Sequence, residues 1–220
     1  DKMRQFPAVE VNKRSTKISE LLPFYFSFES SLGRAASETR GEQALLKTPS
    51  IVQRLDFFPR FTFPLKPIGG FTLTPSLAVR STFYSDSLDP VQRQVVGANL
   101  FRNYAEVSVD IRPPALAKSI ATKQFTGFKH IIEPYAEYRR IVGIDDFART
   151  IRTDERDVVA ETNEIEYGIT NRFFVKRPSA DGKSSQAHEW LDLTIAQKYF
   201  FDPAFGGAFK SCTQAEFLSS

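Results

Sequence analysis

The sequence has few residues of several types, and each scarcity excludes a class of protein. Its 220 residues include one Cys, one Met, one Trp and two His. The single cysteine, Cys212, excludes an intramolecular disulfide framework and a cysteine-rich metal site. Neither sign of charge dominates, because 29 Lys and Arg residues are balanced by 26 Asp and Glu residues. Without a strong basic field, we expect no nucleic-acid partner.

Long apolar runs are also missing. The richest run, residues 21–28, is far shorter than the roughly 18 residues that a transmembrane helix requires. The chain opens on Asp1 and ends on Ser220 without a recognisable start or stop signal, so we expect both ends to lie inside a longer protein. What the sequence does contain is phenylalanine, and its 21 Phe residues favour strands over helices.

Apolar and polar residues alternate along most of the chain, which is typical of strands with two unlike faces. For example, Leu73 and Leu77 share one phase, whereas Ser76 and Arg80 share the other. The pattern predicts strands at residues 6–12, 22–34, 54–65, 71–84, 100–112, 128–139, 164–176 and 190–200. The six strands after residue 50 carry acidic and basic residues on the polar phase and none on the apolar phase. Since a one-residue slip would invert both faces, the register is strongly specified.

Two architectures fit this alternation: a soluble sandwich that buries the apolar phase between two sheets, and a transmembrane barrel that turns it toward lipid. Strand length favours the barrel. The predicted strands run about 11–14 residues, whereas soluble strands cluster at about 5–6 and transmembrane strands need about 9–11. Phe71 and Phe83 lie roughly 40 Å apart along their strand, or roughly 30 Å once tilted, which is close to the apolar band with its aromatic girdles.

The barrel interpretation assigns each phase to a side. The polar phase should line a wet lumen, where mixed charges either merely brace the wall or also pass a bulky, phosphate-bearing amphiphile. Its candidate residues are Arg54, Arg60, Arg80, Arg102, Glu106, Glu133, Glu137, Glu164, Glu166 and Arg172. The lipid-facing candidates are Phe71, Leu73, Leu77, Val79, Phe83, Val107, Val109, Ile111, Ile165 and Ile169.

The connections fit a barrel with short periplasmic turns and long outer loops. Residues 64–70 form a Pro/Gly turn that we place in the periplasm, and the polar segment 141–160 is then extracellular. Residues 85–98 and the segment after Asp202 are also long and polar. The exception is 113–127, which is long for a periplasmic turn and whose start at Pro113 could open a short helix.

No constellation predicts catalysis. His130 lies on the apolar phase and Ser108 on the polar phase of another strand, so the Ser–His pair of a lipase is not expected and His130 should be structural. Acidic residues cluster in one predicted loop, at Asp145, Asp146, Asp154, Glu155 and Asp157. They lack calcium-loop spacing and alternate with arginines, so we expect a solvated loop held by its own ion pairs, with weak binding of ions or sugar phosphates as the alternative. We therefore predict no catalytic, cofactor or metal site.

Several stretches resemble the barrel of the lipopolysaccharide-assembly protein LptD (OstA) family. The stretch His130-Ile131-Ile132-Glu133-Pro134-Tyr135-Ala136-Glu137-Tyr138 is similar to the family's H-x-I-E-P-x-x-x-Y strand. The other similar stretches, in chain order, are Arg54–Arg60, Leu73–Leu77, Asp154–Asp157 followed by Thr162–Tyr167 and Thr170–Arg172, and Gln197–Asp202. Their order and spacing match over most of residues 6–205.

The resemblance implies an outer-membrane translocon of a Gram-negative-type cell that inserts lipopolysaccharide into the outer leaflet and is not an enzyme. Its partners would be lipopolysaccharide, the bilayer, a small LptE-like plug lipoprotein and periplasmic bridge proteins, the last two bound through parts outside this chain. We expect residues 1–220 to be one fragment of a single barrel domain: an all-β antiparallel meander that forms a partial arc of a large transmembrane β-barrel. The gate strands and disulfide cysteines of the family would lie outside it, so Cys212 is not one of those cysteines. The alternatives are another outer-membrane barrel, a porin or adhesin, and a soluble β-sandwich binding module.

Overall fold

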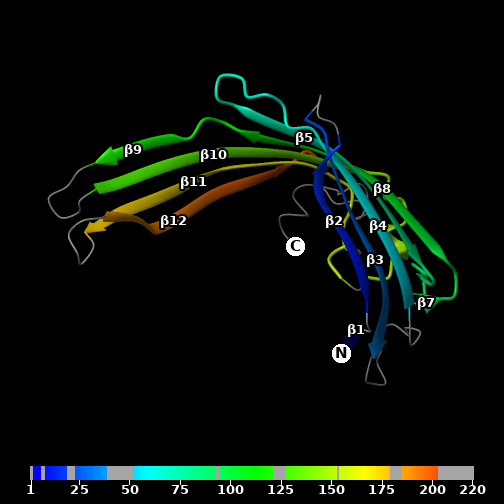
Figure 1. The fold of residues 1–220 in the computed structure, drawn as a ribbon. Helices are drawn as coiled ribbons and strands as arrows, with labels where there is room; N and C mark the ends of the chain where they lie inside the picture. The colour runs from blue at the N-terminus through cyan, green and yellow to red at the C-terminus, as the bar shows by residue number, and fades with distance from the viewer. Residues whose placement is uncertain are drawn as a thin grey trace.

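A computed structural model describes residues 2–5, 8–18, 23–38, 52–92, 95–120, 127–152, 154–178 and 185–202. Nearly all of them belong to strands (Figure 1). The strands are β1 (Lys2–Gln5), β2 (Val9–Lys17), β3 (Tyr25–Glu38), β4 (Val52–Thr62), β5 (Thr72–Tyr84), β6 (Ser87–Leu88), β7 (Val95–Val96), β8 (Leu100–Arg112), β9 (Leu116–Ile120), β10 (Gly127–Val142), β11 (Thr162–Pro178) and β12 (Ser185–Phe200). One 3₁₀ turn, η1, covers Phe147–Arg149. No described helix is long and apolar enough to cross a membrane.

The long strands form one antiparallel meander. Their order in the sheet is β1-β3-β4-β5-β8-β10-β11-β12, with β2 also paired to β3 and β9 to β10. The sheet curves into an open arc with a concave and a convex side (Figure 1). The predicted all-β meander and partial arc are therefore confirmed. The single-domain assignment of residues 1–220 stays a prediction.

Register follows the alternation of the sequence. Strand β5 pairs with β8 without a break from Thr72–Arg112 to Tyr84–Leu100. Strand β10 pairs in the same way with β11, and one bulge between Phe173 and Phe174 offsets the pairing of β11 with β12. Because like phases meet across each pair, every side chain of one phase emerges on the same side of the arc.

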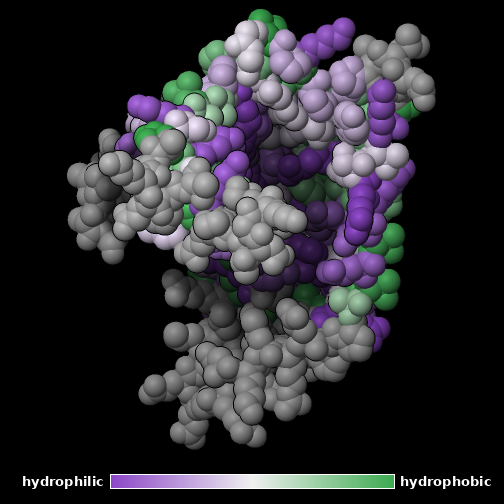
Figure 2. All heavy atoms as spheres, turned by 60° about the vertical axis from the view of Figure 1, so that its left-hand side comes forward, coloured by the Kyte–Doolittle hydropathy of each residue, from purple (hydrophilic) through white to green (hydrophobic). Residues whose placement is uncertain are grey.

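Burial is inverted relative to a soluble protein. On β8, Phe101 is 66% exposed on the convex side, whereas the next residue, Arg102, is 2% exposed on the concave side. Figure 2 shows hydrophilic residues gathered in the hollow of the arc. Among the described residues, Tyr104, Ile141 and Ile144 form a buried apolar cluster between the concave wall and the loop 143–161. The described apolar rows are therefore not covered by a second sheet or by helices.

The segment 113–127 corrects a prediction. The start at Pro113 does not open a helix, because Leu116–Ile120 form β9 and pair with the first half of β10. Strand β8 pairs with the second half of β10. Strands β8 and β9 therefore lie end to end along the same edge of β10. The two prolines at 113 and 114 lack the N–H groups that a continuous ladder needs, and they separate the two strands.

Two ends of the sheet can be distinguished. The turn end contains residues 64–70, where Gly69 and Gly70 adopt positive φ angles of 61° and 85° that glycine alone tolerates easily. The loop end contains the connection 85–99, which includes the β6–β7 hairpin, and the loop 143–161. Segment 39–51, the tail after Asp202 and Cys212 lie outside the described residues.

Candidate transport surface

The loop 143–161 folds back onto the concave face and is held there by ion pairs. Arg54 on β4 contacts both carboxylate oxygens of Asp157 at 3.0 Å and an Asp154 oxygen at 2.5 Å. The Tyr84 hydroxyl on β5 donates a hydrogen bond of 2.6 Å to Asp157, whose side chain is 0% exposed. The expected solvated loop held by its own ion pairs is therefore wrong for this part, although Arg149 does pair with Asp146 inside the loop.

Further contacts reach the loop backbone. The Arg102 guanidinium donates hydrogen bonds to the carbonyl oxygens of Arg156, at 3.0 Å, and Val159. Arg156 in turn donates to the Ser31 hydroxyl on β3 at 3.0 Å and lies 3.7 Å from Glu10 on β2. We call the Arg54, Tyr84 and Arg102 contacts the loop latch. It joins residues that are 54 to 103 positions apart in the sequence, so it fixes the loop against the wall.

Charge and burial act in opposite directions on Asp154. Burial alone would raise the pKa of this carboxyl, because it disfavours the charged form. The hydrogen bond and charge of Arg54, with the backbone N–H of Arg156, outweigh burial and hold the pKa of Asp154 below its usual range. Asp154 is therefore ionised at neutral pH and acts as an anchor for Arg54.

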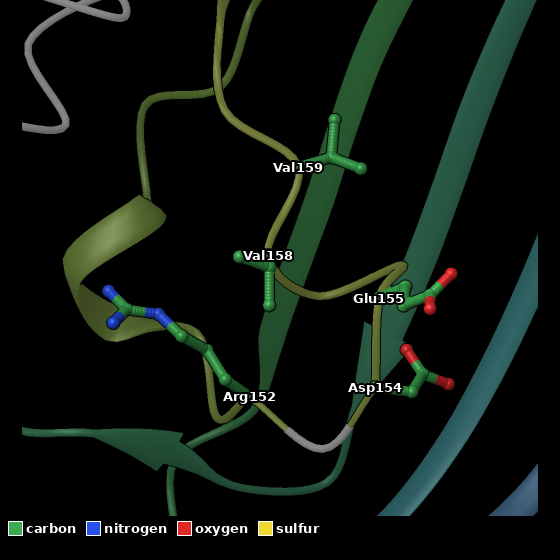
Figure 3. Close-up of a pocket in the computed structure, with 5 residues that line it drawn as sticks. All are labelled: Arg152, Asp154, Glu155, Val158 and Val159. Carbon is green, nitrogen blue, oxygen red and sulfur yellow. The ribbon is translucent and has the colours of Figure 1, made fainter.

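A shallow pocket of about 600 Å³ opens on this loop, lined by Arg152, Asp154, Glu155, Val158 and Val159. The carboxylates of Asp154 and Glu155 point to one side of the loop and the Arg152 guanidinium to the other (Figure 3). In the described part of the chain no cluster of three or more His, Cys, Asp or Glu residues could hold a metal ion.

Below the latch, the wall is lined by ion pairs that share partners. Glu106 accepts hydrogen bonds of 2.9 Å from both Arg60 and Arg139, so one buried carboxylate holds two guanidinium groups. Arg80 lies 3.3 Å from Asp56 and stacks over the Phe58 ring at 4.2 Å. Such sharing offsets the cost of removing these charges from bulk water.

The ion pairs between β11 and its neighbours include more exposed side chains than those of the latch. Lys198 on β12 lies 3.3 Å from both Glu164 and Glu166 on β11. Arg172 pairs with Glu189 at 2.7 Å and lies 3.8 Å from Glu133. The described concave surface therefore alternates cations and anions, with no long run of one sign.

The predicted site residues separate by side of the arc. All ten lumen-facing candidates lie on the concave phase, and eight of them, all but Glu133 and Glu137, form hydrogen bonds or ion pairs shorter than 3.5 Å. The ten lipid-facing candidates lie on the convex phase, where Leu77, Val79 and Val107 are exposed. What each side contacts in the cell stays a prediction.

Sequence reasoning missed several wall residues. Tyr84 and Tyr104 face the concave side with the arginines. In the alternation of polar and apolar residues an aromatic ring does not count as polar, so the sequence did not mark them as wall residues. His130, predicted to be structural, stacks on Phe173 at 4.3 Å and lies 3.1 Å from Asn171. Ser108, on the other face, is hydrogen-bonded to Ser76 at 2.7 Å.

A scan against protein-family models adds the deciding observation. Residues 2–204 match the family described as LptD, LPS transport system D. The chain belongs to the LptD family. A search of curated proteins returned no match. Membership places the chain in a family of transport proteins, not enzymes, of the Gram-negative outer membrane, and gives it a role in lipopolysaccharide transport.

Proposed function

We propose that this LptD-family chain forms part of the wall of the translocon that inserts lipopolysaccharide into the outer leaflet. The observation that carries the proposal is the inverted sheet. Its convex side exposes large apolar residues, including Phe57, Leu77 and Val107, while its concave side holds ionised groups. Exposed apolar rows of this extent cost free energy in water, and hydrocarbon removes that cost.

The concave side suits the polar part of a glycolipid. Its charges are mixed, so a phosphate-bearing sugar chain meets both cations and hydrogen-bond acceptors and is not trapped by a field of one sign. The described wall offers half-exposed guanidinium groups at Arg60, Arg139 and Arg172, each already held by a carboxylate. Paired arginines bind phosphate weakly enough to release it, which transport requires.

The remaining parts of the proposal follow the family. The partners are lipopolysaccharide, a small plug lipoprotein and periplasmic bridge proteins, with the protein contacts made through other parts of the complete protein. The turn 64–70 is periplasmic and the loop 143–161 extracellular. In this arrangement the latch holds the loop against the concave face of the wall, at its extracellular end.

Depletion of the complete protein tests the function. We expect lipopolysaccharide to disappear from the cell surface and accumulate inside, with small-solute uptake intact. Loss of small-solute uptake with normal surface lipopolysaccharide would instead support a porin.

Cysteine labelling tests the two sides, in a protein whose Cys212 is replaced by Ser. We expect a membrane-impermeant maleimide to label Glu137→Cys, because Glu137 is exposed on the concave side away from the latch. Val107→Cys should stay unlabelled in the membrane and react only after solubilisation. Preferential labelling at Val107 would overturn the assignment of the sides.

A further inference from the structure

Strand β9, at the turn end of the sheet, has a paired neighbour on one side only. It pairs with β10 through Leu116–Ile120, and no other described strand pairs with it (Figure 1). Strand β5, which runs beside β8, begins at Thr72, and Thr72 pairs with Arg112. In the adjoining turn, a Cβ at Gly70 would lie 2.9 Å from the Pro114 ring. Apart from its two outer edges, the described sheet therefore presents a short open strand edge beyond Pro114.

This edge is accessible to a further strand. All five residues of β9 are exposed, including Leu116 at 64% and Ile120 at 42%. The free side of a strand presents backbone N–H and C=O groups, and an extended peptide can pair with them as another strand of the sheet does. Because the edge is only five residues long, the side chains around it must decide which peptide binds.

A pocket of about 720 Å³ lies beside the edge, and its lining includes the concave residues Lys129, Ile131 and Phe174. The concave residues of β9, Ala117 and Ser119, pair directly with Ile131 and Lys129. Since Ala117 and Ser119 are small, they leave the pocket open toward the edge. A long apolar side chain on an added strand can therefore cross them and pack against Ile131 and Phe174.

The charge around the edge is positive. The sequence has no acidic residue between Asp110 and Glu133, and this interval contains Lys118, Lys123 and Lys129. Lys118 and Lys129 are exposed, and no described residue forms an ion pair with either of them. A lysine on an edge strand opposes pairing with basic or uncharged strands, whereas an acidic strand neutralises it. The edge therefore favours a strand that carries carboxylates.

We propose that the edge of β9 and its pocket bind an extended acidic peptide segment of a partner protein, which pairs with β9 as an additional strand. A central apolar side chain of the peptide enters the pocket, and neighbouring carboxylates pair with Lys129 on the concave side and Lys118 on the convex side. This inference rests on the proposed function, which makes the turn end periplasmic. An unpaired strand edge is costly in hydrocarbon, so a β9 edge in the periplasm is also the arrangement that a soluble partner can reach.

The test uses the complete protein, with Cys212 replaced by Ser, in phosphatidylcholine nanodiscs and three fluorescent peptides of equal length. The first peptide has Glu and Val around a central Leu, the second replaces each Glu by Lys, and the third replaces the two residues beside the Leu by Pro. Fluorescence anisotropy measures each Kd. We expect the first peptide to bind and the other two to bind at least about tenfold more weakly, because one lacks the carboxylates and the other lacks backbone donors.

Variants of the protein test the charges. Lys118→Gln/Lys129→Gln should weaken binding of the first peptide about tenfold, as expected for the loss of one charge-assisted hydrogen bond. The matched control, Lys13→Gln/Arg34→Gln, removes the same charge from β2 and β3 and should bind as the wild type does. Lys118→Arg/Lys129→Arg keeps the charge, should fold if the glutamine variant does not, and should bind the first peptide. Heat-modifiable migration in electrophoresis checks folding.

Disulfide cross-linking locates the bound peptide. Ser119→Cys is introduced in the Cys212→Ser background, and single cysteines are placed at successive positions of the first peptide. We expect cross-links at every second position, because the side chains of an added strand alternate between the two sides of the sheet. Ser76→Cys, which is on the concave side of β5 in the interior of the sheet, should give none.

The proposal is overturned if the first peptide does not bind, if the lysine variant binds it unchanged or loses no more than the control, or if the proline peptide binds equally. Cross-links at every position would show a non-specific anion site and also overturn it. Loss of peptide binding when phosphatidylglycerol is added to the nanodiscs would assign the lysines to the membrane, with the same consequence. A Val107→Cys that stays protected while the peptide fails to bind refutes only this inference, whereas a labelled Val107→Cys refutes the proposed function.

Discussion

At the scale of single residues, the concave face is stabilised by ion pairs in which removal of one charge leaves its partner buried and uncompensated. Asp157 is fully buried and is satisfied by Arg54 and by the Tyr84 hydroxyl. Removing one partner of a buried ion pair costs about 3–5 kcal/mol, because the other charge stays buried without compensation. The loop can avoid this cost by leaving the wall. Substitution of a latch residue should therefore change the position of the loop more than the stability of the sheet.

Arg54→Gln should therefore release the loop. We expect trypsin to cleave after the exposed Arg152 at least about tenfold faster, because cleavage follows the population of the open form. The matched control is Arg172→Gln, which breaks an exposed ion pair worth about 1 kcal/mol or less and should leave cleavage unchanged. Arg54→Gln/Asp157→Asn should recover part of the protection, since it leaves no unpaired carboxylate at position 157. Wild-type cleavage in Arg54→Gln would show that the latch does not hold the loop.

Gly168 is needed for close approach between strands. A Cβ at this position would lie 2.5 Å from the Ile195 carbonyl oxygen and 3.0 Å from the Tyr135 ring. We expect Gly168→Ala to destabilise the folded protein by about 1–3 kcal/mol, as overpacking does elsewhere. Urea titration in lipid vesicles measures this change. Gly127→Ala is the control, because its Cβ would meet only the flexible Lys176 side chain at 3.5 Å or more. Equal midpoints for the two variants would contradict the prediction.

At the scale of elements, period two predicted every long strand, because each carries its own alternation. The pairing of β5 with β8 and of β10 with β11 also follows from the chain order of a meander. The strand β9 was missed because Pro113 and Pro114 at its start resemble the first turn of a helix, and its partner lies in β10. The latch was missed because Arg54 and Asp154 are a hundred residues apart and neither has a local signal for the other.

The loop should respond to acid through Asp154. Its pKa is lower with the loop attached than with the loop free, so the contact with Arg54 stabilises attachment above the ordinary Asp pKa of about 3.9. This stabilisation is lost as the pH falls through the lowered pKa. We expect a spin label at Val158→Cys, in a Cys212→Ser background, to become mobile below about pH 4. Asp154→Asn should remove this part of the transition, and an identical acid profile in that variant would assign it to other groups.

At the scale of the whole molecule, the described sheet is a single layer with two open edges. Strand β12 pairs only with β11 among the described residues, and the opposite edge ends in β1 and β2. An open edge of backbone N–H and C=O groups is costly in lipid, so the proposed function requires both edges to be paired. The proposed function gives this layer a different solvent on each side, which accounts for the small size of the buried apolar cluster among the described residues.

A charge placed at different depths on the convex side measures where the hydrocarbon lies. Val107 is near the middle of β8 and Asn103 is near its loop end, on the same side. We expect Val107→Arg to destabilise membrane insertion by about 2–4 kcal/mol and Asn103→Arg by about 0–1, because the cost of an arginine falls from the bilayer midplane to the interface. Urea-dependent folding into phosphatidylcholine vesicles gives both values. If a protein layer covered this side, the cost would depend on packing and not on depth, so a penalty at Asn103 as large as that at Val107 would refute a lipid-facing sheet.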